Sequence, residues 1–182
     1  IAVGPGLSMN VAAAEITRCV LERDDKVRIL DADALNIIAG EHIDYKGSRE
    51  GQIIITPHIM EMSRLTGKTV ADIKEHMIES AKEYAIQHSC ICILKDARTV
   101  VTDGQKVYIN CTGNDGMSTG GCGDVLTGLI AGMTAMGLDA FEAACLSVYV
   151  HGKAGDYAAS GKGRAGMTAA DVSEAIAYVL KR

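Results

Sequence analysis

This chain has few of the residues that bind nucleic acids or span membranes. Its 182 residues include no Trp, one Phe and two Pro, and its formal net charge at pH 7 is −5. Because there is no basic surplus and almost no aromatic surface for stacking on bases, we expect no nucleic-acid partner. No apolar run reaches the roughly 18–20 residues that cross a bilayer, so we expect no membrane partner either. The content of 48% hydrophobic and 23% charged residues is typical of one globular domain.

The cysteines form no metal-binding pattern. Cys90 and Cys92 share one face of an expected strand, but no second pair or nearby histidine completes a zinc set. We expect reduced thiols in a cytoplasmic protein. The chain begins with Ile1 rather than Met and lacks the basic and apolar opening of a signal peptide, so we expect a piece of a longer polypeptide.

Apolar strands alternate with helical segments along most of the chain. Buried strands are expected at residues 1–3, 27–30, 52–55 and 91–94, followed by a hairpin of 99–102 and 106–109 around Asp103-Gly104. Helices are expected at 8–23 (capped by Ser8), after Thr56-Pro57, at 69–87, 125–136, 140–159 and 168–180. This order predicts one three-layer α/β/α domain over residues 1–182, with a mainly parallel sheet and helices on both faces. Ligands of such sheets bind beyond the carboxyl ends of the strands.

The most informative segment is NCTGNDGMSTGGCGDVLTG, residues 110–128, where glycines precede a helix. Glycines let the backbone approach a ligand closely, and a helix start adds partial positive charge, so the segment suits an anion such as phosphate. Asp124 lies at the same point. It could accept a proton from a hydroxyl that attacks phosphorus. Alternatively, Asp124 caps the helix in a glycine-rich surface loop.

Four further polar motifs each follow an expected strand. Gly4-Pro5-Gly6-Leu7 indicates a tight turn, and Asp31-Ala-Asp-Ala-Leu-Asn36 places two carboxylates and an amide together, with Asp33 a possible helix cap. Thr56-Pro57-His58 opens a helix, and Lys95 offers a point charge to phosphate. Since carboxyl ends of parallel strands meet at one edge of a sheet, we expect one shared site.

These motifs resemble those of the ADP/ATP-dependent NAD(P)H-hydrate dehydratases of the ribokinase-like superfamily. Their glycine-rich signature reads roughly Thr-Gly-Asn-Pro-Gly-Met-(Ala/Ser)-Thr-(Gly/Ala)-Gly-(Ser/Thr)-Gly-Asp-Val-Leu-Thr-Gly, and this chain departs from it at Asp115 and Cys122. The Asp-Ala-Asp-Ala-Leu-Asn segment matches at all six positions. Ile59-Met60 replaces the Pro-Gly of the family's Thr-Pro-His-Pro-Gly-Glu, Asp96 replaces the glycine of Leu-Lys-Gly-x-x-Thr, and Ser8 replaces the last glycine of Gly-Pro-Gly-(Leu/Met)-Gly.

The resemblance implies a ribokinase-like fold and repair of a damaged nicotinamide cofactor. The ring hydroxyl of hydrated NADH or NADPH would attack the terminal phosphate of ADP or ATP, with Asp124 as the base. Asp124, Gly6 and His58 would contact the hydrated dinucleotide. The adenine nucleotide would lie against Lys95, Asp96, Ala97, Arg98, Thr99, Gly121, Cys122 and Gly123. Mg²⁺ is expected with the nucleotide, held by Asp31 or Asp33 through water and not by a dedicated ligand set.

The resemblance also bears on partners and alternatives. Family members carry a stretch before the Gly-Pro-Gly motif, so we expect this chain to associate with that segment or to form a homo-oligomer over the open sheet edge.

A small-molecule kinase of the same superfamily, for a hydroxymethyl-heterocycle or a sugar, would use the same Asp124 and anion site. A nucleotide-binding regulator without activity is a third hypothesis. The Asp31–Asn36 and Thr56–His58 motifs favour the dehydratase.

Overall fold

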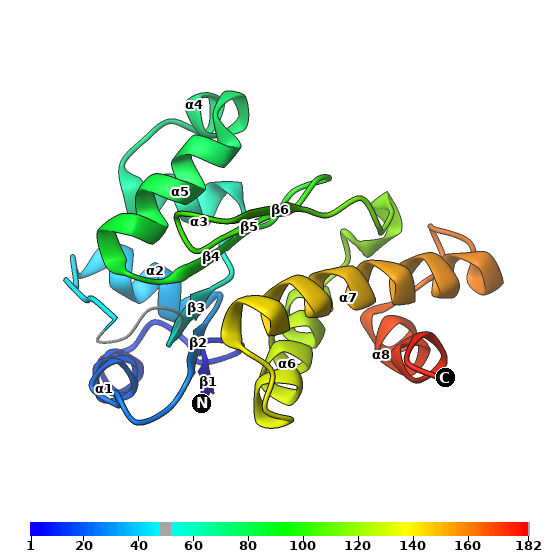
Figure 1. The fold of residues 1–182 in the computed structure, drawn as a ribbon, viewed down its shortest axis with the longest axis horizontal. Coiled ribbons are helices and arrows are strands. Elements are labelled where there is room, and N and C mark those ends of the chain that lie inside the picture. The colour runs from blue at the N-terminus through cyan, green and yellow to red at the C-terminus, as the bar shows by residue number, and fades with distance from the viewer. Residues whose placement is uncertain (48–51, 182) are drawn as a thin grey trace.

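A six-stranded sheet forms the centre of the computed structural model, which describes residues 1–47 and 52–181 (Figure 1). Its strands stand in sequence order: β1 (Ala2–Val3), β2 (Arg28–Leu30), β3 (Ile53–Ile55), β4 (Ile91–Leu94), β5 (Val100–Thr102) and β6 (Val107–Ile109). β1 to β4 are parallel, whereas β5 and β6 continue the sheet as an antiparallel hairpin. The mainly parallel sheet and the hairpin around Asp103-Gly104 are both confirmed.

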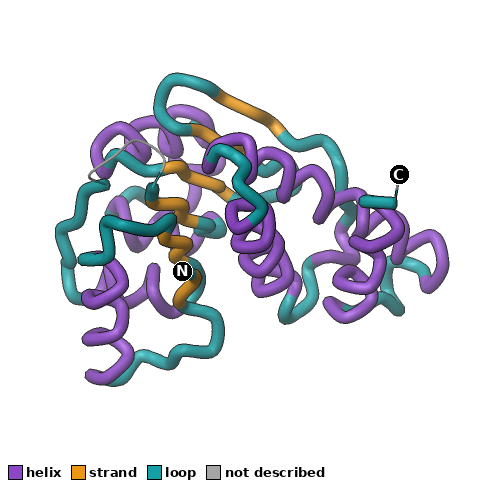
Figure 2. Tube along the Cα trace, turned by 60° about the horizontal axis from the view of Figure 1, so that its bottom comes forward, coloured by secondary structure: helices purple, strands orange, loops and turns teal. Residues whose placement is uncertain are grey.

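Helices cover both faces of this sheet (Figures 1 and 2). One face carries α1 (Val11–Leu21), α2 (Asp33–Gly40), α3 (Ile59–Thr66), α4 (Val70–Glu75) and α5 (Met77–His88). α6 (Cys122–Ala135) and α7 (Ala140–Lys162) cover the other face, and α8 (Ala169–Val179) packs on α6 and α7 beyond the sheet. The short 3-10 turn η1 (Asp115–Met117) lies in the glycine-rich loop. The three-layer α/β/α prediction is confirmed.

Alternate side chains of the strands divide the core between the two faces. In β2 and β3, Leu30, Ile53 and Ile55 face the α1–α5 side, whereas Ile29 and Ile54 face α6 and α7. Successive side chains of a strand point to opposite faces, and here both faces are covered by helices. This explains why β3 and β4 are continuous apolar runs. Their buried packing fixes the carboxyl ends of β1 to β4 along one edge of the sheet.

Two helix caps differ from the predictions. α1 begins after Asn10, whose side chain accepts the N–H of Ala13, and Ser8 is not the cap. Ser8 instead lies in the left-handed region (φ 75°) and donates its N–H to Asp33 at 2.8 Å. α3 is capped by His58, whereas a Thr followed by Pro predicts a cap at Thr56 with Pro57 in the first turn. In both cases a polar side chain nearer the helix reaches the free N–H groups of the first turn.

The other helices differ mainly in length. The helix expected over 69–87 is split into α4 and α5, because His76 leaves the helical region with φ −126° and ψ 50°. The capping boxes opened by Thr69 and Thr168 are present. α6 begins at Cys122, earlier than predicted, since Gly121 occupies the cap position with φ 90°. None of the helices in the described ranges combines the length and hydropathy that a bilayer span requires.

Candidate functional site

A cavity of about 850 Å³ lies beside the ends of β4 and β6 and the start of α6. Small-molecule sites commonly have volumes of roughly 300–1,000 Å³. Four stretches of chain supply most of its walls: 95–99 after β4, 110–119 of the glycine-rich loop, the first turns of α6, and the middle of α7. Two isolated side chains complete the lining, His58 and Arg164. Residues from both halves of the chain therefore line the cavity.

Most of the predicted site residues line this cavity. They are His58, Lys95, Asp96, Ala97, Arg98, Thr99, Cys122 and Gly123. Gly6, Gly121 and Asp124 are not among the lining residues. Gly121 caps α6, Asp124 is exposed in the first turn of α6, and Gly6 is exposed in the turn after β1. Their ligand contacts remain predictions.

The start of α6 has the geometry of an anion site. No side chain caps this helix, and its cap residue is Gly121 in a left-handed conformation. Asp124 is therefore not the helix cap, which the alternative interpretation of the sequence required. The first N–H groups of a helix have no partner within the helix, and the macrodipole adds partial positive charge there. An uncapped start at a cavity wall is suited to bind phosphate oxygens.

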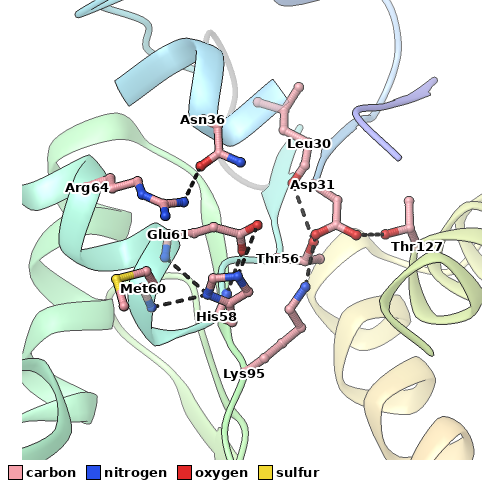
Figure 3. A network of polar contacts seen from close by, with 10 residues as sticks. All are labelled: Leu30, Asp31, Asn36, Thr56, His58, Met60, Glu61, Arg64, Lys95 and Thr127. Carbon is pink, nitrogen blue, oxygen red and sulfur yellow. Dashed lines mark hydrogen bonds and ion pairs between the residues drawn. The ribbon is translucent and has the colours of Figure 1, made fainter. Parts of the chain in front are cut away.

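Lys95 and Asp31 form a buried ion pair beside this helix start (Figure 3). Lys95 Nζ lies 2.9 Å from Asp31 Oδ1, and Thr127 of α6 donates its hydroxyl to Asp31 Oδ2 at 2.7 Å. Burial alone would raise the pKa of Asp31, but the Lys95 charge and hydrogen bonds from Thr56 and Thr127 outweigh it and hold that pKa below its usual value. A Cβ at Gly123 would lie only 3.6 Å from Lys95 Nζ. The ammonium group thus lies against the first turn of α6.

The partners of Asp31 bear on the magnesium prediction. Asp31 is 1% exposed and both of its oxygens already accept hydrogen bonds. Asp33 is less buried and accepts the N–H of Ser8. Within the described ranges, no group of three or more His, Cys, Asp or Glu side chains is placed to hold a metal ion. The residues present therefore do not fit a cation held by protein ligands alone.

The backbone of His58 pairs with the backbone of Lys95. A parallel bridge pairs the two residues beyond the ends of β3 and β4, and Lys95 donates its N–H to Pro57 at 2.8 Å. The His58 Nδ1 accepts the N–H groups of Met60 and Glu61, each at 3.1 Å, and Glu61 accepts the N–H of His58. About half of the His58 side chain, 51%, is exposed. Its Nδ1 is therefore committed to the cap, and its Nε2 lies 3.5 Å from Glu61 Oε1 on the half-exposed side of the ring.

Comparison with known proteins agrees with this geometry. The family model described as NAD(P)H-hydrate dehydratase matches residues 1–178. The chain belongs to the NAD(P)H-hydrate dehydratase family. It is 45% identical to the bifunctional NAD(P)H-hydrate repair enzyme of Moorella thermoacetica over its full length, and the matched region is 34% of that relative. The chain thus spans about a third of the length of this curated relative.

Solved structures show the same fold. An ADP/ATP-dependent NAD(P)H-hydrate dehydratase from Bacillus subtilis, co-crystallised with ATP/Mg²⁺ and soaked with CoA, is 33% identical, with a TM-score of 0.88 over 98% of this chain and 64% of that one. A ribokinase-like superfamily protein from Enterococcus faecalis V583 is 27% identical, with a TM-score of 0.86 over 98% and 62% of the two chains. The predicted ribokinase-like dehydratase fold is confirmed.

The part of this dehydratase-family site that the sequence did not reveal is α7. His151 and Gly152 line the cavity from the middle of that helix. The pKa of His151 is lowered to about 4, mainly by burial and to a smaller extent by the positive charge of Lys95. A hydrogen bond with the Cys122 backbone raises this pKa but is outweighed. His151 is therefore neutral at pH 7. A glycine inside a helix costs about 1 kcal/mol relative to alanine. Gly152 and Gly155 were therefore the feature of the sequence that could have indicated a close contact with α7.

Lys95→Ala should destabilise the fold because Asp31 would keep its charge without a cation. Breaking a buried pair costs about 3–5 kcal/mol, and we expect about 3 kcal/mol in the free energy of unfolding measured with urea. Adding Asp31→Asn to Lys95→Ala should recover part of this loss. Lys74→Ala, at an exposed position of α4, is the control and should change stability little. An equal loss in the single and double variants would show that the pair does not stabilise the fold.

His151 should make the protein less stable in mild acid. Its folded-state pKa of about 4 lies below the ordinary value of 6.5, so protons bind preferentially to the unfolded chain as the pH falls below about 6.5. This linkage removes about 2 kcal/mol of stability between pH 7 and pH 5. His151→Asn should therefore lose less stability over this interval than the unaltered protein, in urea unfolding at both pH values.

The matched control for this measurement is His42→Asn. His42 is exposed, and its left-handed backbone (φ 50°) is one that Asn tolerates. This variant should keep the pH dependence of the unaltered protein. If His151→Asn keeps it as well, the imidazole is not held neutral by the fold.

Proposed function

We propose that this chain dehydrates (6S)-NAD(P)H hydrate to NAD(P)H with ADP or ATP as co-substrate. The activity is that of a hydro-lyase acting in nicotinamide cofactor repair. The observation that carries this proposal is that the Lys95–Thr99 segment and the uncapped start of α6 form walls of one cavity. Family membership supports it, as does the ADP/ATP-dependent dehydratase named for the B. subtilis structure.

The chemistry proceeds in two steps. The hydroxyl of the hydrated ring attacks the terminal phosphorus of the nucleotide, which forms a phosphate ester and releases AMP from ADP or ADP from ATP. The ester carbon–oxygen bond then breaks as the ring nitrogen supplies electron density, inorganic phosphate leaves, and the adjacent ring carbon loses a proton to water to form the ring double bond. The products are NADH or NADPH, phosphate and the shortened nucleotide. Positioning and charge stabilisation supply most of the catalysis in such phosphoryl transfers.

The two substrates would approach the start of α6 from different sides. Lys95, Asp96, Ala97, Arg98 and Thr99 with Cys122 and Gly123 would hold the adenine nucleotide inside the cavity. Asp124 and Gly6 lie outside its lining, which suits groups that contact the second substrate. The His58 Nε2 would donate to the hydrated dinucleotide, since its Nδ1 accepts the N–H groups of the cap and the ring proton is therefore on Nε2.

Within this arrangement Asp124 would take the proton of the attacking hydroxyl. It is exposed and belongs to the first turn of the helix whose N–H groups, from Gly121 to Asp124, would stabilise the developing charge on phosphorus. Lys95 would add a positive charge on the other side of Gly123. Mg²⁺ bound to the nucleotide phosphates and to water fits this site, and when bound it neutralises phosphate charge.

Asp124→Asn should abolish turnover while leaving nucleotide affinity nearly unchanged. The amide has almost the same shape but cannot accept the proton, and loss of a general base typically lowers the rate by about 10²–10⁴-fold. Turnover would be followed by the absorbance of NADH formed from hydrated NADH with ADP or ATP, and affinity by calorimetry. Activity within a few-fold of the unaltered protein would exclude Asp124 as the base.

Glu142→Gln is the matched control, because Glu142 is an exposed acidic residue in the first turn of α7. It should leave the rate unchanged. A small-molecule kinase would use the same groups, so a parallel assay would follow nucleotide-dependent phosphorylation of hydroxymethyl heterocycles and sugars. Phosphorylated product without NADH formation would favour the kinase, and nucleotide binding without any turnover would favour the regulator.

We also propose that the protein is cytoplasmic and that further polypeptide covers its β1 edge. Six free thiols support a reducing compartment. β1 pairs only with β2 in the described sheet, and in the segment that follows β1 in the chain Met9, Val11 and Ile16 are 57%, 77% and 47% exposed. An open edge and exposed apolar side chains both favour association with a partner segment or a second copy.

Gel filtration with intact-mass analysis should show an assembly larger than 19.2 kDa, or a co-purifying peptide. Val11→Ser together with Ile16→Ser should shift the protein towards smaller species by removing apolar contact area. Ile86→Ser is the control, since Ile86 is a comparably exposed residue (61%) on α5. A fully active 19.2 kDa monomer would contradict this proposal.

A further inference from the structure

The glycine-rich loop is attached to α7 by three hydrogen bonds. Thr112 donates its hydroxyl to the Tyr149 carbonyl at 3.0 Å. Asp156 accepts twice: its Oδ2 from the backbone N–H of Gly113, and its Oδ1 from the side-chain amide of Asn114, both at 3.1 Å. Tyr149 and Asp156 are seven residues apart, and therefore lie on the same face of the helix two turns apart.

Two glycines on α7 allow the loop to come this close. A Cβ at Gly152 would overlap the Thr112 hydroxyl and lie 2.7 Å from the Thr112 carbonyl carbon. A Cβ at Gly155 would lie 2.7 Å from Cγ of Met117. Both glycines are inside a 23-residue helix, where glycine is less favourable than alanine. Close approach of the loop is the structural reason for them.

The attached segment forms one wall of the cavity. Thr112, Gly113, Asn114 and Met117 all line it, whereas Asp156 does not. Asn114 also accepts the N–H of Gly116 through its Oδ1 at 3.1 Å and so caps the η1 turn. Asp156 therefore fixes both the backbone of Gly113 and the orientation of the Asn114 amide, which in turn fixes η1.

We propose that Asp156 is a positioning residue of the cavity: it holds the 112–117 loop in the shape that binds the adenine nucleotide. The proposal rests on the proposed function, because the ligand of the cavity is taken to be a nucleotide. Asp156 acts through the loop and touches no ligand. Both of its oxygens are engaged by the loop, so its effect on binding depends on the donor pattern at residues 113 and 114.

An exchange of the two side chains separates this role from general stabilisation. Asp156→Asn would set one amide NH₂ against another, and Asn114→Asp would set two carboxylates face to face. In the double variant the new amide at 156 can donate to the new carboxylate at 114, while its oxygen still accepts from Gly113 and position 114 still accepts from Gly116. All of these hydrogen bonds are thus restored, and only the one between positions 114 and 156 runs in the opposite direction.

Calorimetry with ADP and with ATP should show affinity about tenfold weaker in each single variant, since each loses a hydrogen bond in which a charged group takes part. The double variant should bind both nucleotides more tightly than the Asn114→Asp variant, which has the same carboxylate on the cavity wall but no donor opposite it. Asp171→Asn is the control, because Asp171 is a hydrogen-bonded carboxylate of α8 that does not line the cavity. It should lower the melting temperature without changing affinity.

Amide hydrogen exchange of the ligand-free protein tests the positioning role independently. Exchange at Gly113 and Gly116 should accelerate in both single variants and slow again in the double variant. If the unaltered protein binds neither ADP nor ATP, the proposed function fails, and the exchange pattern still decides whether Asp156 holds the loop. Single variants that keep full affinity and slow exchange, or a double variant no better than the single ones, would overturn the proposal.

Discussion

The buried ion pair of Lys95 and Asp31 is the contact on which the site depends. It joins the end of β4 to the end of β2, and Thr127 extends it to α6 on the opposite face of the sheet. A buried carboxylate without a partner would be costly, so Asp31 requires the ammonium group and both hydroxyls. Because this requirement can be met in few arrangements, it fixes the positive charge beside the uncapped start of α6.

A second constraint is the close contact between α7 and the glycine-rich loop. Small residues at 152 and 155 remove the side chains that would hold the loop away, and Asp156 supplies the acceptors that hold it in place. The two sides of the cavity are thus fixed by different means. The β-strand side relies on a buried charge pair, and the helical side relies on close backbone approach.

The departures from the family signature lie at positions that tolerate them. Asp115, where proline is usual, is 78% exposed in its side chain and pairs at 3.1 Å with Arg164, which also lines the cavity. Such an exposed pair contributes roughly 0–1 kcal/mol. Cys122, where Ser or Thr is usual, is buried, and burial raises the pKa of its thiol, so it behaves as a small apolar residue. Asp96 is exposed at the cavity wall.

Local patterns in the sequence determined the strands, the hairpin, the capping boxes at Thr69 and Thr168, and the edge of the sheet where the polar motifs meet. These follow from apolar periodicity and turn residues, which act within a few positions along the chain. The division of α4 from α5 at His76 and the capping of α3 by His58 were not evident, since competing caps differ by small energies. Only the tertiary structure decided that Asp31 pairs with Lys95, that His151 is neutral, and that Asp156 holds the loop. Those contacts join residues tens of positions apart, and burial, which sets their strength, exists only once the layers have packed.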